Sequence, residues 1–197
     1  MRLLTTTNGG KLSPLLTEGK SMDAKAAILV SAIETATRHL LEQDRTHSQP
    51  PLDPRSPWPE HCSAFFRETM RQLAKRGLYV SPSFTDENAN ANELGRRIRL
   101  PSHQWEEVEK HEDKQKLAND GVLVVGSEVN PAGSGHLGFV YPVARSANPP
   151  FIRDGNIHRD KTTGAITAPS SYGAVPAGLA FHLARTKWFK YRRPIKS

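Results

Sequence analysis

The sequence predicts an α+β fold in which N-terminal helices pack on an antiparallel β-sheet. Apolar residues recur with helical spacing in several segments before residue 122. From residue 122 onward, the apolar runs are short, rich in β-branched and aromatic residues, and separated by turn residues. The helical and strand patterns do not alternate, so the order differs from the βαβ repeat of a doubly wound fold. A chain of 197 residues suits one domain of ordinary size.

The chain divides into three parts. Residues 1–21 are polar and carry Gly-Gly and Ser-Pro pairs, which predict a flexible N-terminal arm. Residues 22–54 contain an N-terminal helix and a Pro-rich connection, and residues 55–197 form the main domain. There are no internal repeats.

The first helix is predicted over residues 22–43. Its apolar positions are spaced by four, three and four residues: Leu29, Ile33, Ala36 and Leu40. The next stretch, residues 44–61, holds five prolines and cannot form regular structure. We expect it to cross the surface or to form one wall of a cleft.

Three further helices are predicted before the strands begin. Residues 62–77 have helical period and end at Gly77, a typical helix C-terminus. Their buried stripe consists of Phe65, Phe66, Met70 and Leu73. A short helix is expected near 91–98, and a surface helix over 102–121, opened by Ser102 and closed by Gly121.

Five segments then have strand character. Residues 122–126 and 135–143 are joined by a turn-rich link, and residues 150–154, 175–184 and 186–191 follow. The C-terminal segment TKWFKYRRPIK mixes aromatic and basic residues and could stack on nucleic acid. We favour an edge strand whose Lys and Arg residues protect it from further pairing.

The net charge is +7, with 27 Lys and Arg residues against 20 Asp and Glu, and the pI is about 9.7. This excess favours anionic partners such as cell-wall polymers, but it is spread too thinly to predict a nucleic-acid partner. There is neither a long apolar run nor a signal-peptide pattern at the start. We therefore expect no membrane insertion, synthesis in the cytoplasm, and another route to any external site of action.

The glycines of GSGHLGFVYP match the G-x-G-x-x-G spacing of a dinucleotide-binding loop. Such a loop must begin a helix, whose free N–H groups hold the pyrophosphate. Here the glycines lead into FVYPV, which is strand-like and ends near a proline. The match is accidental, and His136 at the start of this strand becomes the residue of interest.

The chain has one cysteine, Cys62, at the first turn of the second predicted helix. A lone cysteine is most often a small buried apolar residue, and most histidines are structural. However, the positive end of a helix favours the reactive thiolate. A helix-start cysteine followed by a strand-start histidine is an arrangement of cysteine hydrolases.

Other chemistry is less well supported by the residues. The carboxylates of residues 106–113 could suggest a glycosidase, but they alternate with lysines as on a solvated helix face. His111-Glu112 does not continue to H-E-x-x-H because position 115 is Gln. The sequence therefore predicts neither a metal site nor a cofactor.

The chain resembles the papain-like cell-wall amidases and endopeptidases, the superfamily that includes CHAP and NlpC-type domains. The resemblance covers roughly residues 55–192 and lies in HCSAFFRETMRQL and in KLANDGVLVVGSEVNPAGSGHLGFVYP. Two later matches are the P-x-I-x-x-G pattern, which begins at Pro150, and the aromatic strand TKWFKY. The resemblance implies a papain-like fold for residues 55–197, in which a helix headed by the catalytic cysteine packs on the sheet.

The resemblance also implies roles for individual residues. Cys62 would attack an amide carbonyl, and His136 would exchange the proton. For the third residue, which orients the imidazole, we favour Asp154 because a carboxylate stabilises imidazolium directly. The other candidates are Asn148, Asn156 and His158. The backbone N–H of Cys62 would bind the oxyanion, with His61 or Trp58 as further candidates.

The implied function is a cysteine peptidase or amidase that cleaves peptidoglycan stem peptides without a cofactor. A short basic chain without a signal peptide resembles an antibacterial type VI secretion amidase effector, which would act in the periplasm of a target cell. An immunity protein that plugs the cleft is then an expected partner. Two alternatives are a phage-type lysin and a non-catalytic module that binds cell wall or protein on the same fold.

Overall fold

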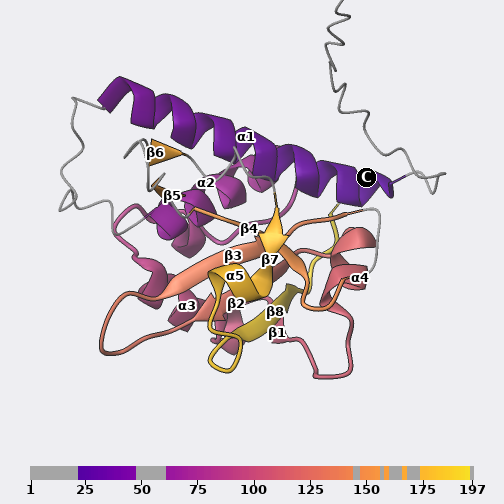
Figure 1. Ribbon diagram of the computed structural model, residues 1–197. Helices are drawn as coiled ribbons and strands as arrows, with labels where there is room; N and C mark the ends of the chain where they lie inside the picture. The colour runs from indigo at the N-terminus through magenta and orange to yellow at the C-terminus, as the bar shows by residue number, and fades with distance from the viewer. Residues whose placement is uncertain are drawn as a thin grey trace, which may run out of the picture.

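The computed structural model shows helices packed against an antiparallel sheet, which confirms the predicted α+β class (Figure 1). The structure describes residues 22–47, 61–143, 147–155, 158–159, 166–167 and 174–195. The predicted arm at residues 1–21 lies outside the described residues, and so do residues 48–60 of the Pro-rich connection.

Five α-helices occur in the described residues: α1 Ala24–His47, α2 His61–Lys75, α3 Ala91–Ile98, α4 Lys114–Asn119 and α5 Ala177–Ala180. Two 3-10 turns also occur: η1 Pro82–Phe84 lies between α2 and α3, and η2 Pro101–His103 lies between α3 and β1. The helices predicted over 22–43, 62–77 and near 91–98 are thus confirmed as α1, α2 and α3. However, α1 continues to His47, four residues into the stretch 44–61 for which the sequence predicts no regular structure. The first turn after α2 includes Gly77 at a φ of +87°, a conformation that favours glycine.

The main sheet has six strands in the order β1-β8-β2-β3-β4-β7, and all neighbours are antiparallel. Their bounds are β1 Trp105–Glu107, β2 Val124–Glu128, β3 His136–Val140, β4 Phe151–Asp154, β7 Val175–Pro176 and β8 Lys187–Tyr191. A separate pair joins β5 His158–Arg159 and β6 Ile166–Thr167. β2, β3, β4 and β8 occupy the segments in which the sequence predicts strands.

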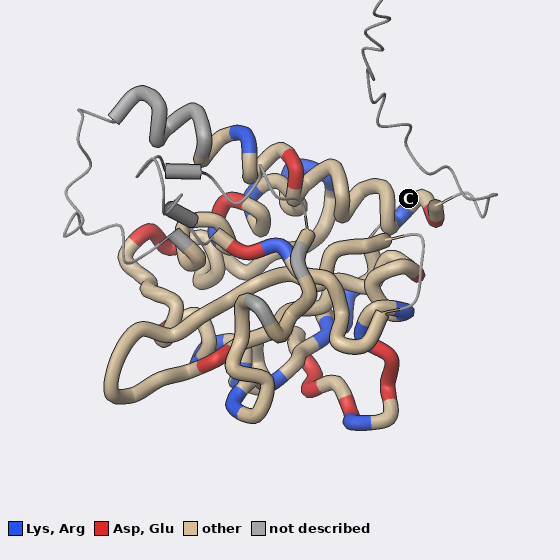
Figure 2. Tube along the Cα trace, in the orientation of Figure 1, with Lys and Arg blue, Asp and Glu red and all other residues tan. Residues whose placement is uncertain are grey.

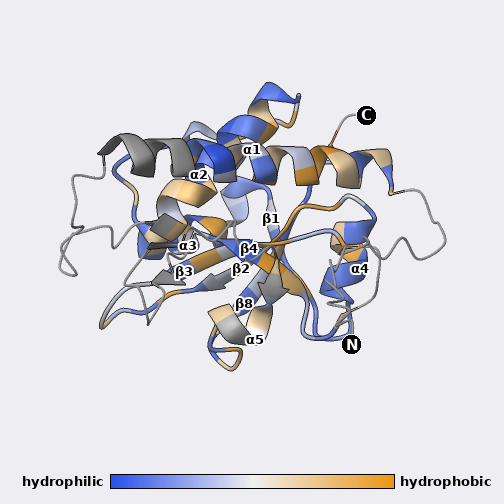
Figure 3. Cartoon of the chain, turned by 45° about the horizontal axis from the view of Figure 1, so that its top comes forward, coloured by the Kyte–Doolittle hydropathy of each residue, from blue (hydrophilic) through white to orange (hydrophobic). Residues whose placement is uncertain are grey.

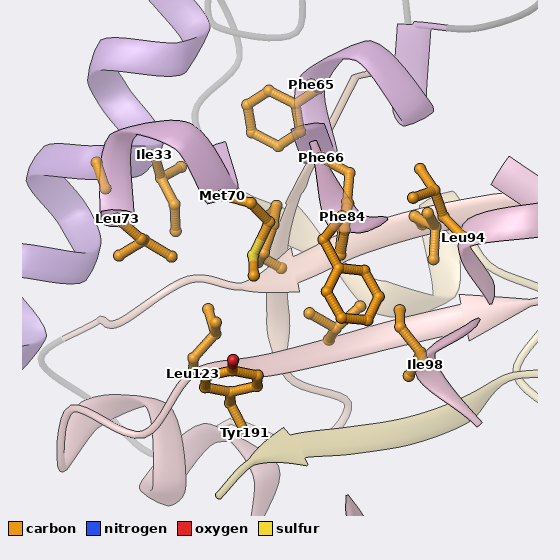
Figure 4. Packing of buried hydrophobic residues seen from close by; sticks show 14 of the residues in the cluster. Ile33, Phe65, Phe66, Met70, Leu73, Phe84, Leu94, Ile98, Leu123 and Tyr191 are labelled. Atoms are coloured by element: carbon orange, nitrogen blue, oxygen red, sulfur yellow. The ribbon is translucent and has the colours of Figure 1, made fainter. Parts of the chain in front are cut away.

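The larger core lies between the sheet and the layer formed by α1, α2 and α3 (Figure 4). Phe66 of α2 stacks on Phe139 of β3, with ring centroids 5.2 Å apart and ring planes 10° apart. Ile33 of α1 is fully buried in this same core. The buried residues of α1 recur at helical spacing, as in Leu29, Ile33 and Ala36, and Figure 3 shows hydrophobic and hydrophilic residues interspersed along this helix. Thus α1 is part of the core that supports β3.

A smaller core covers the opposite face of the sheet. It contains Val124, Val140 and Ile152 from the strands, packed with Ala177 and Phe181 from the α5 segment. The alternation of side chains along β3 explains the division, because Leu137 and Phe139 face α2 whereas Val140 faces this second core. The α5 segment therefore covers the face that also receives the side chain of His136.

The predicted helix over 102–121 is wrong in its first half. Residues 105–107 form β1, and the helix α4 begins only after Asp113, whose side chain caps it by accepting from the N–H of Lys116. Trp105 is 3% exposed and packs on Tyr191 of β8 with ring centroids 4.8 Å apart. Burial of this indole against a strand distant in sequence favours extended structure over the local helical pattern.

The C-terminal segment is not an edge strand, since β8 lies between β1 and β2. The lysines of β8 pair with carboxylates of residues 106–113. The sequence instead predicts that these carboxylates pair with lysines of their own helix. Lys187 Nζ lies 3.0 Å from Glu107, and Lys190 Nζ lies 2.6 Å from Glu112. Figure 2 shows this mixing of acidic and basic residues in the β1–α4 region. The carboxylates of 106–113 are thus largely cross-strand and loop partners of β8.

The segment 175–184 is a strand over only its first two residues, and α5 follows directly. The glycine-rich stretch behaves as expected, because Gly138 lies within β3 and no helix begins there. Among the described helices, none combines the length and the apolar character needed to cross a membrane.

Candidate functional site

The structure brings Cys62, His136 and Asp154 together, and each stands at the end of an element. Cys62 is the second residue of α2, His136 is the first residue of β3, and Asp154 is the last residue of β4. They are separated by 74 and 18 positions in the chain. Packing of α2 across β3, together with the β3–β4 pairing, creates this meeting of termini.

The His136–Asp154 contact follows from the register of β3 and β4. Gly138 is the strand partner of Asp154, so His136, Gly138 and Asp154 share one face of the sheet. Nε2 of His136 lies 2.9 Å from Oδ2 of Asp154. A Cβ at position 138 would lie 3.2 Å from the Cβ of Asp154. A glycine there leaves room for the carboxylate to reach diagonally to the imidazole.

The sulfur of Cys62 contacts the other side of the imidazole. It donates to the carbonyl oxygen of Gly135 at 3.9 Å, and its interaction with the ring of His136 helps to raise the pKa of that imidazole. Since Nε2 faces Asp154, the nitrogen available to the sulfur is Nδ1. The order is therefore sulfur, imidazole, carboxylate, and Cys62 is only 6% exposed.

The pKa of His136 is raised from 6.5 to about 9. Burial of the ring acts against this shift because it disfavours the charged form, but hydrogen bonds and charge interactions with Asp154 and Cys62 outweigh it. The imidazole is therefore protonated at neutral pH. The site therefore places a positively charged imidazolium beside Asp154 and Cys62.

An aromatic side chain from the α5 segment holds the imidazole from a third direction. The ring of Phe181 lies 4.7 Å from that of His136, with the planes inclined by 57°. Phe181 packs in turn on Trp188, and both rings lie over Gly126, where a Cβ would come within 3.0 Å of each. The backbone N–H of His182 donates to Glu128 at 3.3 Å, which ties this segment to β2.

Asn92 of α3 holds the turn that leads into His136. Its Nδ2 donates to the carbonyl oxygens of Asn130 and Gly133, at 2.9 and 2.8 Å, and its Oδ1 accepts from the N–H of Asn130 at 2.8 Å. A Cβ on Gly135 would collide with the Asn92 side chain. Asn92 and Gly135 therefore set the path of the chain just before the imidazole.

We predict that Asn92→Ala destabilises the protein by about 1–3 kcal/mol, because backbone groups of the turn lose their partners. The turn also carries His136, so the rate of Cys62 alkylation should fall. Chemical denaturation and an iodoacetamide assay measure the two effects. Asn88→Ala, in an exposed turn that does not contact residues 130–135, serves as the control. Equal alkylation rates in both variants would contradict the role of Asn92.

The remaining residues proposed from the sequence are not brought to the site by the described structure. Asn148 is exposed in the segment before β4. Trp58 and Asn156 lie outside the described residues, and the side chains of His61 and His158 are not described. Among the candidates for the third residue whose side chains are described, Asp154 contacts His136.

The described residues contain no group of three or more His, Cys, Asp or Glu side chains that could hold a metal ion. The Cys62–His136–Asp154 cluster can instead supply a nucleophile, a proton carrier and an orienting carboxylate. Neither the protein-family models nor the curated proteins include a match to the chain.

Proposed function

We propose that the protein is a papain-like cysteine peptidase or amidase that cleaves amide bonds in peptidoglycan stem peptides. The observation that carries the proposal is the ordered contact of Cys62, His136 and Asp154, with the imidazole between sulfur and carboxylate. Support for the substrate class comes from the resemblance over residues 55–192 and from the net charge of +7, which suits an anionic polymer.

The reaction would begin with attack of the Cys62 thiolate on the carbonyl carbon of the scissile amide. As the C–N bond breaks, the His136 imidazolium donates its proton to the leaving amine, and the acyl group remains on sulfur as a thioester. The now neutral imidazole then takes a proton from water, whose oxygen attacks the thioester. The carboxylic acid product leaves, and the thiolate–imidazolium pair is restored.

The start of α2 supplies a means of binding the oxyanion. Residues in the first turn of a helix have backbone N–H groups without intrahelical partners, and Cys62 lies in that turn. When the sulfur of Cys62 bonds to the carbonyl carbon, the carbonyl oxygen becomes an oxyanion, which would lie beside these donors. Each such donor is typically worth about 10²–10³-fold in rate.

Digestion of purified sacculi tests the proposed substrate class. Wild-type protein should release soluble fragments with new amine and carboxyl termini in the stem peptides, identified by mass spectrometry. The same fragments should be absent when the protein is first alkylated with iodoacetamide. If Cys62 reacts rapidly with iodoacetamide but the sacculi stay intact, the proposed substrate is wrong, whereas the proposed cysteine chemistry is not contradicted.

The pH dependence of hydrolysis should show an alkaline limb near pH 9. His136 must be protonated to donate to the leaving amine, and its pKa is raised to about 9. The rate should therefore hold through neutral pH and fall as the pH rises through 9. Initial rates from pH 6 to 10 on one stem-peptide substrate measure this. A rate that falls between pH 6 and 7.5 instead would contradict a protonated imidazole at neutral pH.

One observation favours the alternative of a non-catalytic binding module, because Cys62 is only 6% exposed. In such a module the three residues would be structural, and sacculus binding would survive Cys62→Ala with no release of fragments by the wild type. Co-sedimentation with sacculi, scored beside fragment release, separates the two functions.

The setting in which the enzyme acts is also part of the proposal. We favour an antibacterial effector delivered to the periplasm of a target cell, with a phage-type lysin as the variant. An immunity protein that covers the Cys62–His136 site would protect the producing cell. Expression directed to the periplasm should lyse cells only when Cys62 is intact, and cytoplasmic expression should be harmless.

A further inference from the structure

One carboxylate on α1 holds both of the strands that carry the site. Oε1 of Glu34 accepts hydrogen bonds from the hydroxyl of Tyr141, at 2.9 Å, and from Nη2 of Arg153, at 2.7 Å. Tyr141 directly follows β3, which begins with His136, and Arg153 directly precedes Asp154 on β4. Helix α1 therefore contacts β4 next to Asp154, and it contacts the residue that follows β3 at the end of the strand opposite His136.

The same contact lies beside the end of β4. Among the described residues, β7 pairs with Phe151 and Ile152, and β3 pairs with β4 as far as Asp154. Beyond Ile152, both β3 and the Arg153–Glu34 ion pair hold β4. Arg153 and Asp154 point to opposite faces, so an anchor on one fixes the strand that aims the other.

The contact is buried at Arg153 and partly exposed at Glu34. The side chain of Arg153 is 7% exposed, and its guanidinium lies over the ring of Tyr141, 5.3 Å from the centroid. The pKa of Tyr141 is raised to about 12 by burial and by its hydrogen bond to Glu34, so the phenol remains a donor. The side chain of Glu34 is 37% exposed, so the main cost of losing Glu34 is that the buried guanidinium loses this ion pair.

We propose that Glu34 is a positioning residue for the Cys62–His136–Asp154 site, acting through Arg153 and Tyr141. It sets the place of the β4 end relative to β3, and hence the 2.9 Å contact between Asp154 and His136. This inference rests on the proposed function. It makes α1 a working part of the hydrolase, although the resemblance to the minimal domain begins only near residue 55.

The double variant Glu34→Gln/Arg153→Met tests the proposal with the full chain. Glu34→Gln alone leaves a buried guanidinium without its ion pair and should lower stability, whereas the double variant removes both charges and should regain much of it. Because one charge of each sign is lost, direct charge effects on His136 largely cancel. A misplaced Asp154 should still lower the pKa of His136 and cut the turnover rate about tenfold or more.

The control is His39→Asn, which removes a contact of α1 with Glu68 of α2 rather than with the strands. It should loosen α1 without moving the His136 titration. The readouts are the unfolding temperature, the NMR titration of the His136 ring and turnover on a stem peptide.

The proposal would be overturned if the double variant regained stability and also showed wild-type titration and turnover. Glu34 would then be a purely structural residue. A wild type that shows the raised His136 titration but no turnover would instead count against the proposed function. The positioning of the ring by Glu34 would then still be read from the titration alone.

Discussion

Replacing Cys62 with serine is expected to lower the rate of amide hydrolysis by about 10⁴-fold or more. A serine hydroxyl beside an imidazolium is not ionised, so the nucleophile is lost while the size of the side chain is kept. The site lies at the junction of α2 and β3, and the substitution changes neither element. Fragment release from a defined stem peptide measures the rate, and thermal unfolding verifies the fold.

His136→Ala should cause a loss of similar size, and the double variant should be no worse than either single one. Groups that act as a unit are strongly non-additive, because the remaining member has no function alone. His111→Gln is the matched control, since the side chain of His111 is 79% exposed and its ion pair is with the exposed Glu109. Independent, multiplying losses for Cys62→Ser and His136→Ala would contradict a shared mechanism.

The second large effect is expected for Asp154→Asn, which should lower turnover by about 10²–10⁴-fold. The amide keeps the shape of the side chain but cannot stabilise the imidazolium. The alkaline limb of activity should therefore move from near pH 9 toward lower pH. Asp120→Asn is the control, because Asp120 pairs with Lys116 on the exposed side of α4. An unchanged limb in Asp154→Asn would assign the raised pKa of His136 to another partner.

The same pair links stability to pH in a direction that can be checked. The pKa of His136 is about 6.5 unfolded and about 9 folded, so its contribution is complete below pH 6.5 and is lost as the pH rises through 9. The corresponding decrease in the free energy of unfolding is about 3 kcal/mol at most. Urea denaturation at a series of pH values should show this decrease in the wild type and a flatter profile in Asp154→Asn.

Much of the helical layer and the positions of the central strands along the chain could be predicted from the sequence. The α2 stripe and the Gly77 terminus depend on local spacing and local backbone preference, which are visible in the chain. The meeting of Cys62 and His136, 74 positions apart, was predicted from their places at a helix start and a strand start and from the resemblance, because no local spacing joins them. The short strand β1 was not, since its residues match a helical surface pattern until Trp105 is seen against Tyr191.

The supporting residues of the site could not be predicted for the same reason. Glu34 lies 119 positions before Arg153, and Asn92 lies 38 positions before Asn130. Phe181 occupies an apolar run that predicts a strand, yet its ring covers His136 from the segment after α5. Such contacts depend on where the elements pack, and no local spacing reports them.

The most direct test of the account is the rate at which iodoacetamide alkylates Cys62 between pH 5 and 9. The chain has one cysteine, so the same protein in denaturant is its own reference for a free thiol. We predict that the native protein reacts faster than the denatured chain at pH 6–7, and that His136→Gln abolishes this advantage. A native thiol that reacts no faster than the denatured one, or that is indifferent to His136, would contradict the proposed ion pair.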